Sequence, residues 1–299
     1  MISAADKQST TLQSGNSAYV LNDAGIYTCR DRTEAVATAY ESAGCQTLAE
    51  IQNRHFWYLG RHRFLLHSLQ GMLRRHSSVR GGAAIDLGGG CGGWIHYLQQ
   101  HAPDLFGELA LSDASAAGLQ LAGELLGDDV PRFQIDLLDL RWQQRWNAAF
   151  LLDVLEHIPE DLETLRQIKH ALQPGGLLFV TCPAFNWLWS YNDDLSGHQR
   201  RYTRQGFGQL AQDAGLRLID CRYFMALLGP LLVLSRMRKP RWIDLEPEEV
   251  RKRWDRKQRV PIYPVNQLLR GIFALEAPLG LWVSLPWGTS ILGVFQKEA

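Results

Sequence analysis

The chain has 299 residues, of which 46% are hydrophobic and 21% charged, and its 31 basic residues balance its 31 acidic ones. These values exclude a disordered, collagen-like or coiled-coil chain, and at this length roughly 75% of the unfolded surface can be buried. Because the formal net charge is zero, the chain lacks the overall positive field on which nonspecific nucleic-acid binding depends. We therefore expect no nucleic-acid partner.

The cysteines and the apolar segments bear on the cellular compartment. Five widely spaced cysteines without a CxxC pair favour neither a disulfide framework nor a zinc ribbon, and they fit a reducing cytoplasm. The N-terminus lacks the basic start and apolar run of a signal peptide. The longest apolar stretch, 272–295, contains Glu276 and two prolines, which predicts a buried helix, turn and strand in place of a membrane span. A cytoplasmic protein is expected.

The pattern along the chain predicts five parts. Residues 1–18 are expected to be a flexible tail, and residues 19–80 a mostly helical N-terminal cap. From residue 81 to 224, short apolar strands alternate with helical stretches, which is typical of a parallel sheet covered on both faces. Residues 225–288 are predicted to be a helical insertion that acts as a substrate lid, and residues 289–299 the final strand of the core. The predicted strands are 83–87, 108–112, 132–135, 148–152, 177–181, 217–224 and 290–296.

The insertion combines an apolar run, 226–234, with a charged segment, 236–259, that holds ten basic and five acidic residues. Opposite charges at i,i+4 spacing within that segment predict a solvated helix. An apolar run followed directly by basic residues is also compatible with peripheral contact to an anionic membrane. The sequence leaves both interpretations open.

A glycine loop between a strand and a helix is the most informative segment. Glycines let the backbone approach a ligand closely, and the helix that follows offers free N–H groups. Gly88, Gly90 and Gly92 satisfy the GxGxG loop of S-adenosylmethionine (SAM) enzymes, whereas Gly93 in place of Gly92 satisfies the GxGxxG loop of dinucleotide enzymes. Asp113, which ends the next predicted strand, is placed to accept hydrogen bonds from both ribose hydroxyls of either cofactor. The loop alone leaves the choice open.

Three further motifs follow in order and favour SAM. They are the run 133–140, the run 152–158 with the sequence LDVLEHI, and the turn 172–176 with the sequence LQPGG. With them the chain resembles the class I SAM-dependent methyltransferases, in particular the bacterial ubiquinone-biosynthesis-like group of methyltransferase types 11 and 12. Residues 55–58 and 197–203 are similar to a subset of that group. The resemblance implies a seven-stranded Rossmann-like α/β sheet whose last strand is antiparallel, with SAM as cofactor and S-adenosylhomocysteine as product.

The resemblance also carries cofactor-binding roles to matching positions of this chain. The methionine end of SAM is expected near the first strand and the glycine loop, the ribose on the second strand, the adenine after the third, and the reacting methyl group above the end of the fourth. The corresponding residues are Asp86, Gly88, Gly90 and Gly92 for the methionine end and the loop, Asp113 for the ribose, Asp136 and Leu137 for the adenine, and Asp153 for the mouth of the pocket.

The acceptor site is less specified. An activated methyl group needs mainly alignment with the acceptor, and alignment contributes about 7–11 kcal/mol, whereas a general base adds about a hundred- to ten-thousandfold in rate. His157 and His198 lie nearest the predicted carboxyl edge of the sheet and are the candidate bases. The alternative is that each histidine is satisfied by local contacts. The histidines and carboxylates show no zinc-like spacing, so no metal is expected.

Residues near the fifth strand are candidates for holding the acceptor. Tyr191 is expected to form a wall of the pocket, and Arg200 and Arg201 to bind a carboxylate or phosphate group. The two arginines could equally lock their loop to the acidic pair Asp193 and Asp194. The sequence does not decide between these interpretations.

The function expected from the sequence is a SAM-dependent methyltransferase of the one-carbon transferase class, which acts on the oxygen or nitrogen of a small molecule. One alternative keeps the cofactor but places a lipid-linked or isoprenoid acceptor at a membrane surface. Another is a catalytically silent SAM-binding partner subunit. The identity of the acceptor and the oligomeric state are not predicted.

Overall fold

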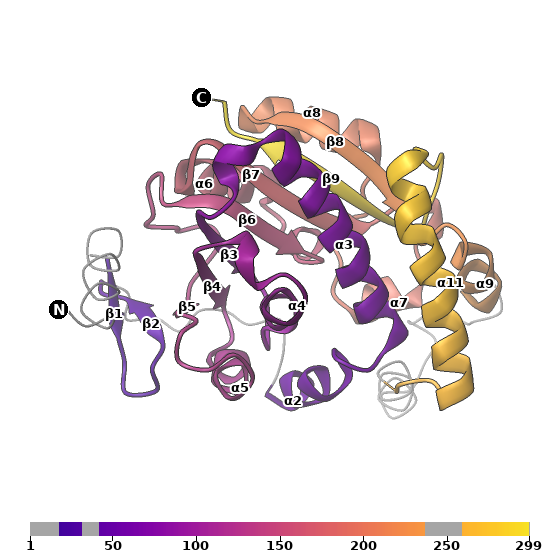
Figure 1. Ribbon diagram of the computed structural model, residues 1–299, viewed down its shortest axis with the longest axis horizontal. Helices are drawn as coiled ribbons and strands as arrows, with labels where there is room; N and C mark the ends of the chain where they lie inside the picture. The colour runs from indigo at the N-terminus through magenta and orange to yellow at the C-terminus, as the bar shows by residue number, and fades with distance from the viewer. Residues whose placement is uncertain (1–17, 32–41, 237–258, 299) are drawn as a thin grey trace.

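The protein is built on one mixed sheet with helices on both faces (Figure 1). The computed structural model describes residues 18–31, 42–236 and 259–298. The strands lie in the order β1-β2-β5-β4-β3-β6-β7-β9-β8. Their bounds are β1 Tyr19–Leu21, β2 Tyr27–Cys29, β3 Ala83–Leu87, β4 Glu108–Asp113, β5 Arg132–Gln134, β6 Trp146–Leu152, β7 Leu172–Pro183, β8 Arg217–Phe224 and β9 Ser290–Gln296. The helices are α2 Ser42–Ile51, α3 Phe56–Arg75, α4 Gly93–His101, α5 Ala116–Leu126, α6 Asp161–Ala171, α7 Tyr191–Leu195, α8 Arg204–Ala214, α9 Gly229–Arg236 and α11 Tyr263–Trp282.

The predicted α/β fold is confirmed, and so is the antiparallel last strand. Strands β3 to β9 form the seven-stranded core, in which β9 lies between β7 and β8 and is antiparallel to both. All seven predicted strands are present. β7 is longer than expected because its first residues, from Leu172, pair with Trp146 before the register shifts.

The start of the predicted helical cap is wrong, because residues 19–29 form a β-hairpin. β1 and β2 are antiparallel, and β2 pairs in parallel with β5, so the sheet gains two strands at that edge. The side chain of Asn22 closes the turn by accepting the N–H groups of Ala24 and Ile26, each at 3.0 Å. Tyr19 is buried with its ring 4.9 Å from that of Trp142. Strands of three residues are too short for a hydrophobic period to reveal them.

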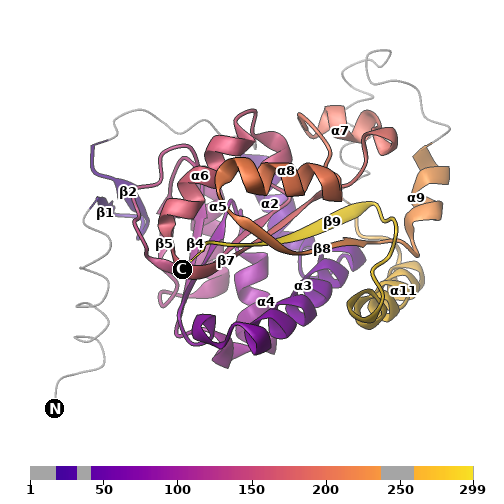
Figure 2. The same ribbon diagram turned by 90° about the horizontal axis from the view of Figure 1, so that it is seen from above.

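Two hydrophobic layers hold the sheet between its helices. Successive side chains of a strand point to opposite faces, so Ala148 and Phe150 of β6 pack in the layer with α3 and α4. Ala149 and Leu151 of the same strand pack in the layer with α6 and α8. Figure 2 shows α3 and α4 on one side of the strands and α6 and α8 on the other. Burial on both faces explains why the core strands read as continuous apolar runs.

Helix α11, in the insertion after β8, packs against the N-terminal helix α3. A Cβ atom on Gly60 would lie 2.1 Å from the ring of Phe273 in α11, so the close approach of the two helices requires glycine there. Asn266 of α11 accepts the N–H of Phe56 and donates to the carbonyl of Arg54, both at 2.9 Å. Residues 237–258, which make up nearly all of the charged segment, lie outside the described residues. Among the described helices, none combines the length and apolar composition required to cross a bilayer.

The strand order reverses between β3 and β6, and this position marks the expected ligand site. β4 and β5 continue the sheet on one side of β3, whereas β6 and β7 continue it on the other. Ligands of open parallel sheets bind at the carboxyl ends of the strands, next to such a reversal. The loops after β3, β4, β6 and β7 therefore meet at one edge.

Candidate cofactor and acceptor site

The glycine loop after β3 adopts a backbone that only glycine adopts readily. Gly88, Gly90 and Gly92 have φ angles of 72°, 56° and 78°. A Cβ atom on Gly88 would also lie 2.8 Å from the side chain of Val154, which follows β6. Gly92 caps α4, so the free N–H groups of this helix point toward the same edge. Such a loop allows a ligand to approach the backbone closely, and the binding roles of its three glycines stay predictions.

Asp113, at the end of β4, braces this loop. Its Oδ2 accepts the N–H of Gly90 and its Oδ1 the N–H of Ser115, both at 2.8 Å. Burial raises the pKa of Asp113, although these backbone N–H groups oppose the change. Each carboxylate oxygen keeps capacity for a second hydrogen bond, and the side chain is only partly buried. Asp113 is thus oriented by the backbone and able to accept ligand hydroxyls.

Asp86, in β3 before the loop, is a buried acid whose carboxyl group lacks a full set of hydrogen-bond partners. It is 1% exposed, and its Oδ1 has no hydrogen-bond partner among the described residues. Burial raises its pKa from 3.8 to about 7, Arg61 opposes this effect and Asp113 adds to it. A buried carboxyl group of this kind favours the approach of a cationic ligand group.

The raised pKa of Asp86 predicts a pH-dependent stability of the free protein. Between about pH 4 and pH 7 the folded state keeps a proton that the unfolded state releases, so the free energy of unfolding should fall as pH rises through this window. The loss from this group is at most about 4 kcal/mol. Asp86→Asn should flatten this part of the profile, which denaturant unfolding at pH 5 and pH 8 measures. Parallel profiles for the two proteins would contradict the assignment.

Asp153, which directly follows β6, pairs with an arginine from the N-terminal helix. Its φ angle of 58° is unusual for a residue other than glycine, and its N–H donates to the carbonyl of Thr181 at 2.9 Å. Nη1 of Arg61 in α3 contacts its carboxylate in an ion pair. The guanidinium carbon of Arg61 also lies 4.8 Å from the centre of the Trp57 ring. The sequence analysis gave Arg61 no role, because no motif spacing links it to a residue 92 positions later.

The two residues predicted to surround the adenine follow β5 at the same edge. Asp136 accepts the N–H of Leu138 at 2.9 Å with its Oδ1, and this bond closes a turn. Leu137 is partly buried. Their contact with adenine stays a prediction.

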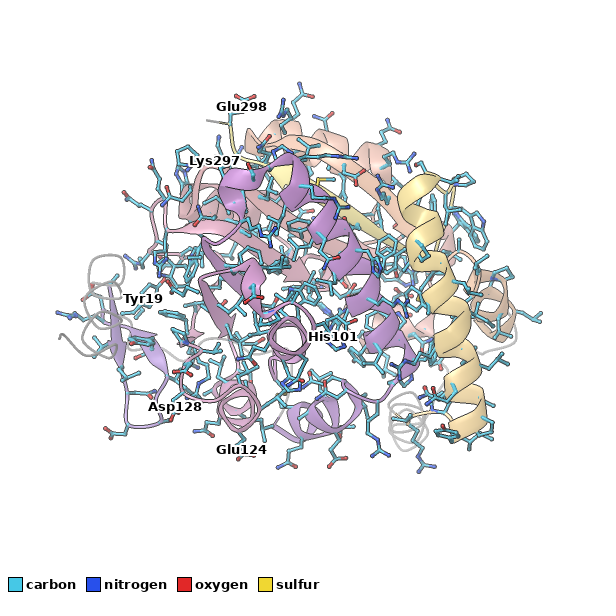
Figure 3. All side chains as sticks on the ribbon, viewed as in Figure 1. Tyr19, His101, Glu124, Asp128, Lys297 and Glu298 are labelled. Carbon is cyan, nitrogen blue, oxygen red and sulfur yellow. The ribbon has the colours of Figure 1, made fainter. Side chains whose placement is uncertain are left out.

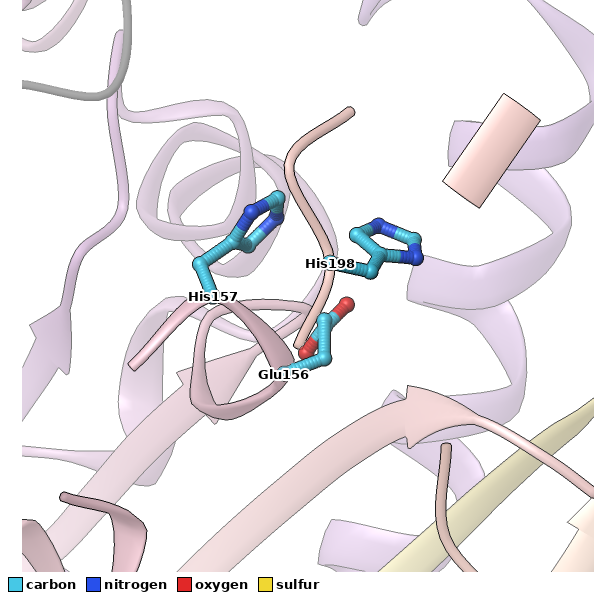
Figure 4. Close-up of side chains that lie close together, drawn as sticks. All are labelled: Glu156, His157 and His198. Carbon is cyan, nitrogen blue, oxygen red and sulfur yellow. The ribbon is translucent and has the colours of Figure 1, made fainter. Parts of the chain in front are cut away.

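The structure brings together the two histidines predicted near the acceptor. His157 lies in a single 3₁₀ turn, Leu155–His157, after β6, and His198 lies in the loop after α7. Their ring centres are 4.8 Å apart with the rings nearly perpendicular. Glu156, which the sequence analysis did not select, lies close to both rings in Figure 4. The N–H of Gln199 donates to the carbonyl of Glu156 at 2.7 Å and ties the two segments together.

Arg201 belongs to the scaffold of the loop. It is 7% exposed, and its Nε and Nη2 donate to the two carboxylate oxygens of Asp193 at 2.8 and 2.9 Å. Burial opposes ionisation of Asp193, but hydrogen bonds from His198 and Arg201 hold its pKa below the usual range. The structure therefore shows the loop-locking alternative for Arg201.

Arg200 and Tyr191 complete the predicted acceptor residues. Arg200 pairs with Asp161 at 2.7 Å and donates to the carbonyl of Pro159 at 2.7 Å, so it locks the loop to the start of α6 and not to Asp194. Tyr191 begins α7 and is partly buried. Contact of Tyr191 with an acceptor stays a prediction.

Comparisons with known proteins give the family. Residues 56–220, more than half of the chain, match the model of a methyltransferase domain. No curated protein sequence matches significantly.

Solved structures share the fold at low identity. Phosphoethanolamine N-methyltransferase 2 of Haemonchus contortus, in complex with SAM, has 14% identity and a TM-score of 0.53, and 91% of this chain aligns with 62% of that chain. A protein described as a sarcosine dimethylglycine methyltransferase of Galdieria sulphuraria has 15% identity and a TM-score of 0.51, with 77% and 84% covered. A complex of the Haloferax volcanii methyltransferase activator Trm112 with its methyltransferase candidate has 15% identity and a TM-score of 0.52, with 86% and 94% covered.

The family match includes the glycine loop, Asp113 and the turn with Glu156 and His157. It thereby decides between the two cofactor classes that the loop left open. The chain belongs to the methyltransferase-domain family and is a class I SAM-dependent methyltransferase.

Proposed function

We propose that this protein transfers the methyl group of SAM to an oxygen or nitrogen of a small-molecule acceptor bound beside His157 and His198. The observation that carries the proposal is the meeting of the braced glycine loop and the histidine pair at the carboxyl edge of one sheet. Bound SAM supplies a methyl group that its sulfonium already activates. The remaining work of the chain is to bind, orient and exclude water.

The residues present fit this cofactor. Asp113 is oriented to accept the ribose hydroxyls, and the loop from Gly88 gives close backbone approach. The unpartnered Oδ1 of Asp86 and the carboxylate of Asp153 favour the cationic end of SAM, which carries an ammonium group and a sulfonium. In this arrangement, the guanidinium group of Arg61 is proposed to pair with the carboxylate of the methionine part of SAM. Asp136 and Leu137 remain the residues proposed for the adenine.

A general base serves an acceptor that must lose a proton. His198 is oriented by Asp193, which accepts from its Nδ1 at 2.9 Å, so its Nε2 is left for the acceptor side. His157 lies against it. Either imidazole can take the proton of an acceptor hydroxyl or ammonium group.

A labelling experiment tests the acceptor class. The protein is incubated with methyl-labelled SAM and a metabolite extract, and label is counted separately in small molecules, lipid vesicles and macromolecules. The proposal predicts label in the small-molecule fraction. Label in the macromolecular fraction would contradict it, and bound SAM without transfer to any fraction would indicate the catalytically silent subunit.

One observation favours a second candidate, an acceptor at a membrane surface. Leu227, Leu231 and Leu234 are 50%, 57% and 59% exposed at helical spacing in and before α9, and Leu268 and Leu275 of α11 are 64% and 65% exposed. Large exposed apolar side chains on neighbouring helices are typical of a membrane or protein contact.

Flotation with anionic vesicles tests this candidate. Wild-type protein should float with the vesicles, and the double variant Leu231→Glu/Leu234→Glu should lose most of that association. Leu21→Glu is the matched control, since Leu21 is 54% exposed in β1, which lies at the opposite end of the molecule from α9 (Figure 1). Wild-type protein that stays at the bottom of the gradient would eliminate the candidate.

A further inference from the structure

The cluster of Glu156, His157 and His198 has the composition of a metal site. One ligand atom from each side chain can be chosen so that all three lie within 4.8 Å of one another. Figure 4 shows Glu156 close to the two imidazole rings, which come from different segments of the chain. Two imidazoles and a carboxylate form a donor set that binds Zn²⁺ and other first-row divalent cations.

Glu156 supplies an independent observation that points to a ligand. Its side chain is 1% exposed, and its Oε2 has no hydrogen-bond partner among the residues that the structure describes. A carboxylate oxygen buried without a partner costs free energy unless a cation or a donor compensates it. A cation held by Glu156 and the two histidines would compensate this oxygen.

His198 is oriented as a ligand histidine usually is. Its Nδ1 bonds to the buried carboxylate of Asp193 at 2.9 Å, which leaves Nε2 for an ion. Asp193 is itself fixed by Arg201 at 2.8 Å and by the N–H of Ser190 at 2.8 Å. Histidines that bind metals commonly donate their other nitrogen to a carboxylate in this way, which fixes the ring and raises its basicity.

The supporting backbone is rigid on both sides of the cluster. Arg200 and Tyr202 both bond to Asp161, at 2.7 and 2.9 Å, and the N–H of Gln199 bonds to Glu156 at 2.7 Å. Zinc ligands lie roughly 2.0–2.2 Å from the ion, so the three ligand atoms need to draw together by side-chain rotation only. His157 and His198 are both partly exposed.

We propose that Glu156, His157 and His198 bind one divalent transition-metal ion, with open coordination positions toward the acceptor pocket. Three protein ligands with an open position are typical of catalytic and not structural zinc sites. Two imidazole ligands favour Zn²⁺ and the other later first-row ions, such as Co²⁺, over Mg²⁺.

The proposed ion also favours acceptors that offer an oxygen atom as a ligand. This part of the inference rests on the proposed function. An acceptor hydroxyl or carboxylate has the oxygen that an open position would bind, and the charge of the ion lowers the pKa of such a hydroxyl. The hydroxyl proton then leaves to solvent, its oxygen forms the bond to the methyl carbon, and the carbon–sulfur electron pair stays on sulfur as the neutral thioether. In the metal-bound protein the imidazole nitrogens are ligands, so activation of the hydroxyl by the ion takes the place of the general base proposed above.

The sequence analysis expected no metal because it looked for closely spaced ligands. Glu156 and His157 are adjacent, whereas His198 follows 41 residues later and comes from another loop. Only the pairing of that loop with the turn after β6 brings the three together.

Metal binding by the chelator-stripped full-length protein tests the inference without any acceptor. Equilibrium dialysis against Zn²⁺, with Mg²⁺ in parallel, should give one Zn²⁺ per chain and no comparable Mg²⁺ binding. Glu156→Gln and His198→Ala should each weaken Zn²⁺ binding by about 10- to 100-fold or more. Co²⁺ provides a second readout, because its visible absorption spectrum reports ligand number and should change in both variants.

Controls separate this inference from the proposed function. His170→Ala removes an exposed histidine in α6 and should leave Zn²⁺ binding unchanged. Thermal unfolding and titration with S-adenosylhomocysteine check that each variant is folded and keeps its cofactor site. Unchanged Zn²⁺ affinity in folded Glu156→Gln and His198→Ala, or no stoichiometric binding to wild type, would overturn the metal site. Failure of wild type to bind S-adenosylhomocysteine would count against the proposed function only.

Discussion

Replacing Asp113 by alanine is expected to weaken binding of S-adenosylhomocysteine by about 100-fold, since each hydrogen bond to a charged group contributes about 1.5–3 kcal/mol. Two effects act together. The variant loses the acceptor for the ribose hydroxyls, and it loses the brace that holds Gly90 and Ser115 at 2.8 Å. Calorimetric titration of both proteins measures the ratio of affinities.

Asp113→Asn separates the two effects, because the amide keeps one oxygen to brace the loop but cannot accept from both hydroxyls. An intermediate affinity is expected for it. The matched control is Glu124→Ala, which removes an exposed acid from α5 (Figure 3) and should bind like wild type. Equal affinities for Asp113→Ala and wild type would show that the ribose is held elsewhere.

Replacing Arg61 by methionine is expected to lower the free energy of unfolding by about 3 kcal/mol, because removing one partner of a buried ion pair leaves the other charge unpaired. The side chains of Arg61 and Asp153 are 9% and 19% exposed, so solvent screens the pair only weakly. The positive charge of Arg61 also opposes the rise in the pKa of Asp86. Without Arg61, the buried Asp86 carboxylate loses a stabilising charge. Denaturant unfolding at neutral pH measures the change.

Two further variants test the cause. Arg61→Met/Asp153→Asn removes both charges of the pair and should recover most of the lost stability. Arg63→Met alters an exposed residue of the same helix and should change stability by less than about 0.5 kcal/mol. Similar losses for the variants at positions 61 and 63 would show that the ion pair is not the source of the effect.

The sequence could predict what depends on local pattern. The core strands are buried on both faces and therefore appear as apolar runs, so all seven were found, three with their bounds unchanged: β3, β8 and β9. The glycine loop was visible because its φ angles require glycine at Gly88, Gly90 and Gly92. Asp113 could be selected from the sequence because it comes at the end of a predicted strand, β4, where ligand-binding residues of such sheets lie.

The sequence could not predict what depends on contacts between distant segments. The β1–β2 hairpin is stabilised by pairing with β5, a strand that follows about a hundred residues later. Arg61 reaches Asp153 only because α3 packs on the face of the sheet that contains β6, the strand that Asp153 follows. From the sequence alone, Arg201 could bind an acceptor or pair within its own loop. Only the fold shows that it pairs with Asp193.

The signal for the third member of the histidine cluster was present but weak. Glu156 lies in an apolar run between Leu155 and His157, where a charged residue is unusual. Its side chain is 1% exposed in the fold, and the loop after α7 bonds to its carbonyl group. A buried acid beside a histidine is a pattern that sequence analysis can search for.

The most direct test of the central claim is calorimetric titration of the purified protein with S-adenosylhomocysteine, with NADH as the parallel control. The account predicts micromolar binding of S-adenosylhomocysteine at one site per chain and no binding of NADH. Binding of NADH in its place would mean that the loop is used through Gly93 as a dinucleotide site, and it would contradict the proposed roles of Asp86, Asp113 and Asp153 in holding SAM.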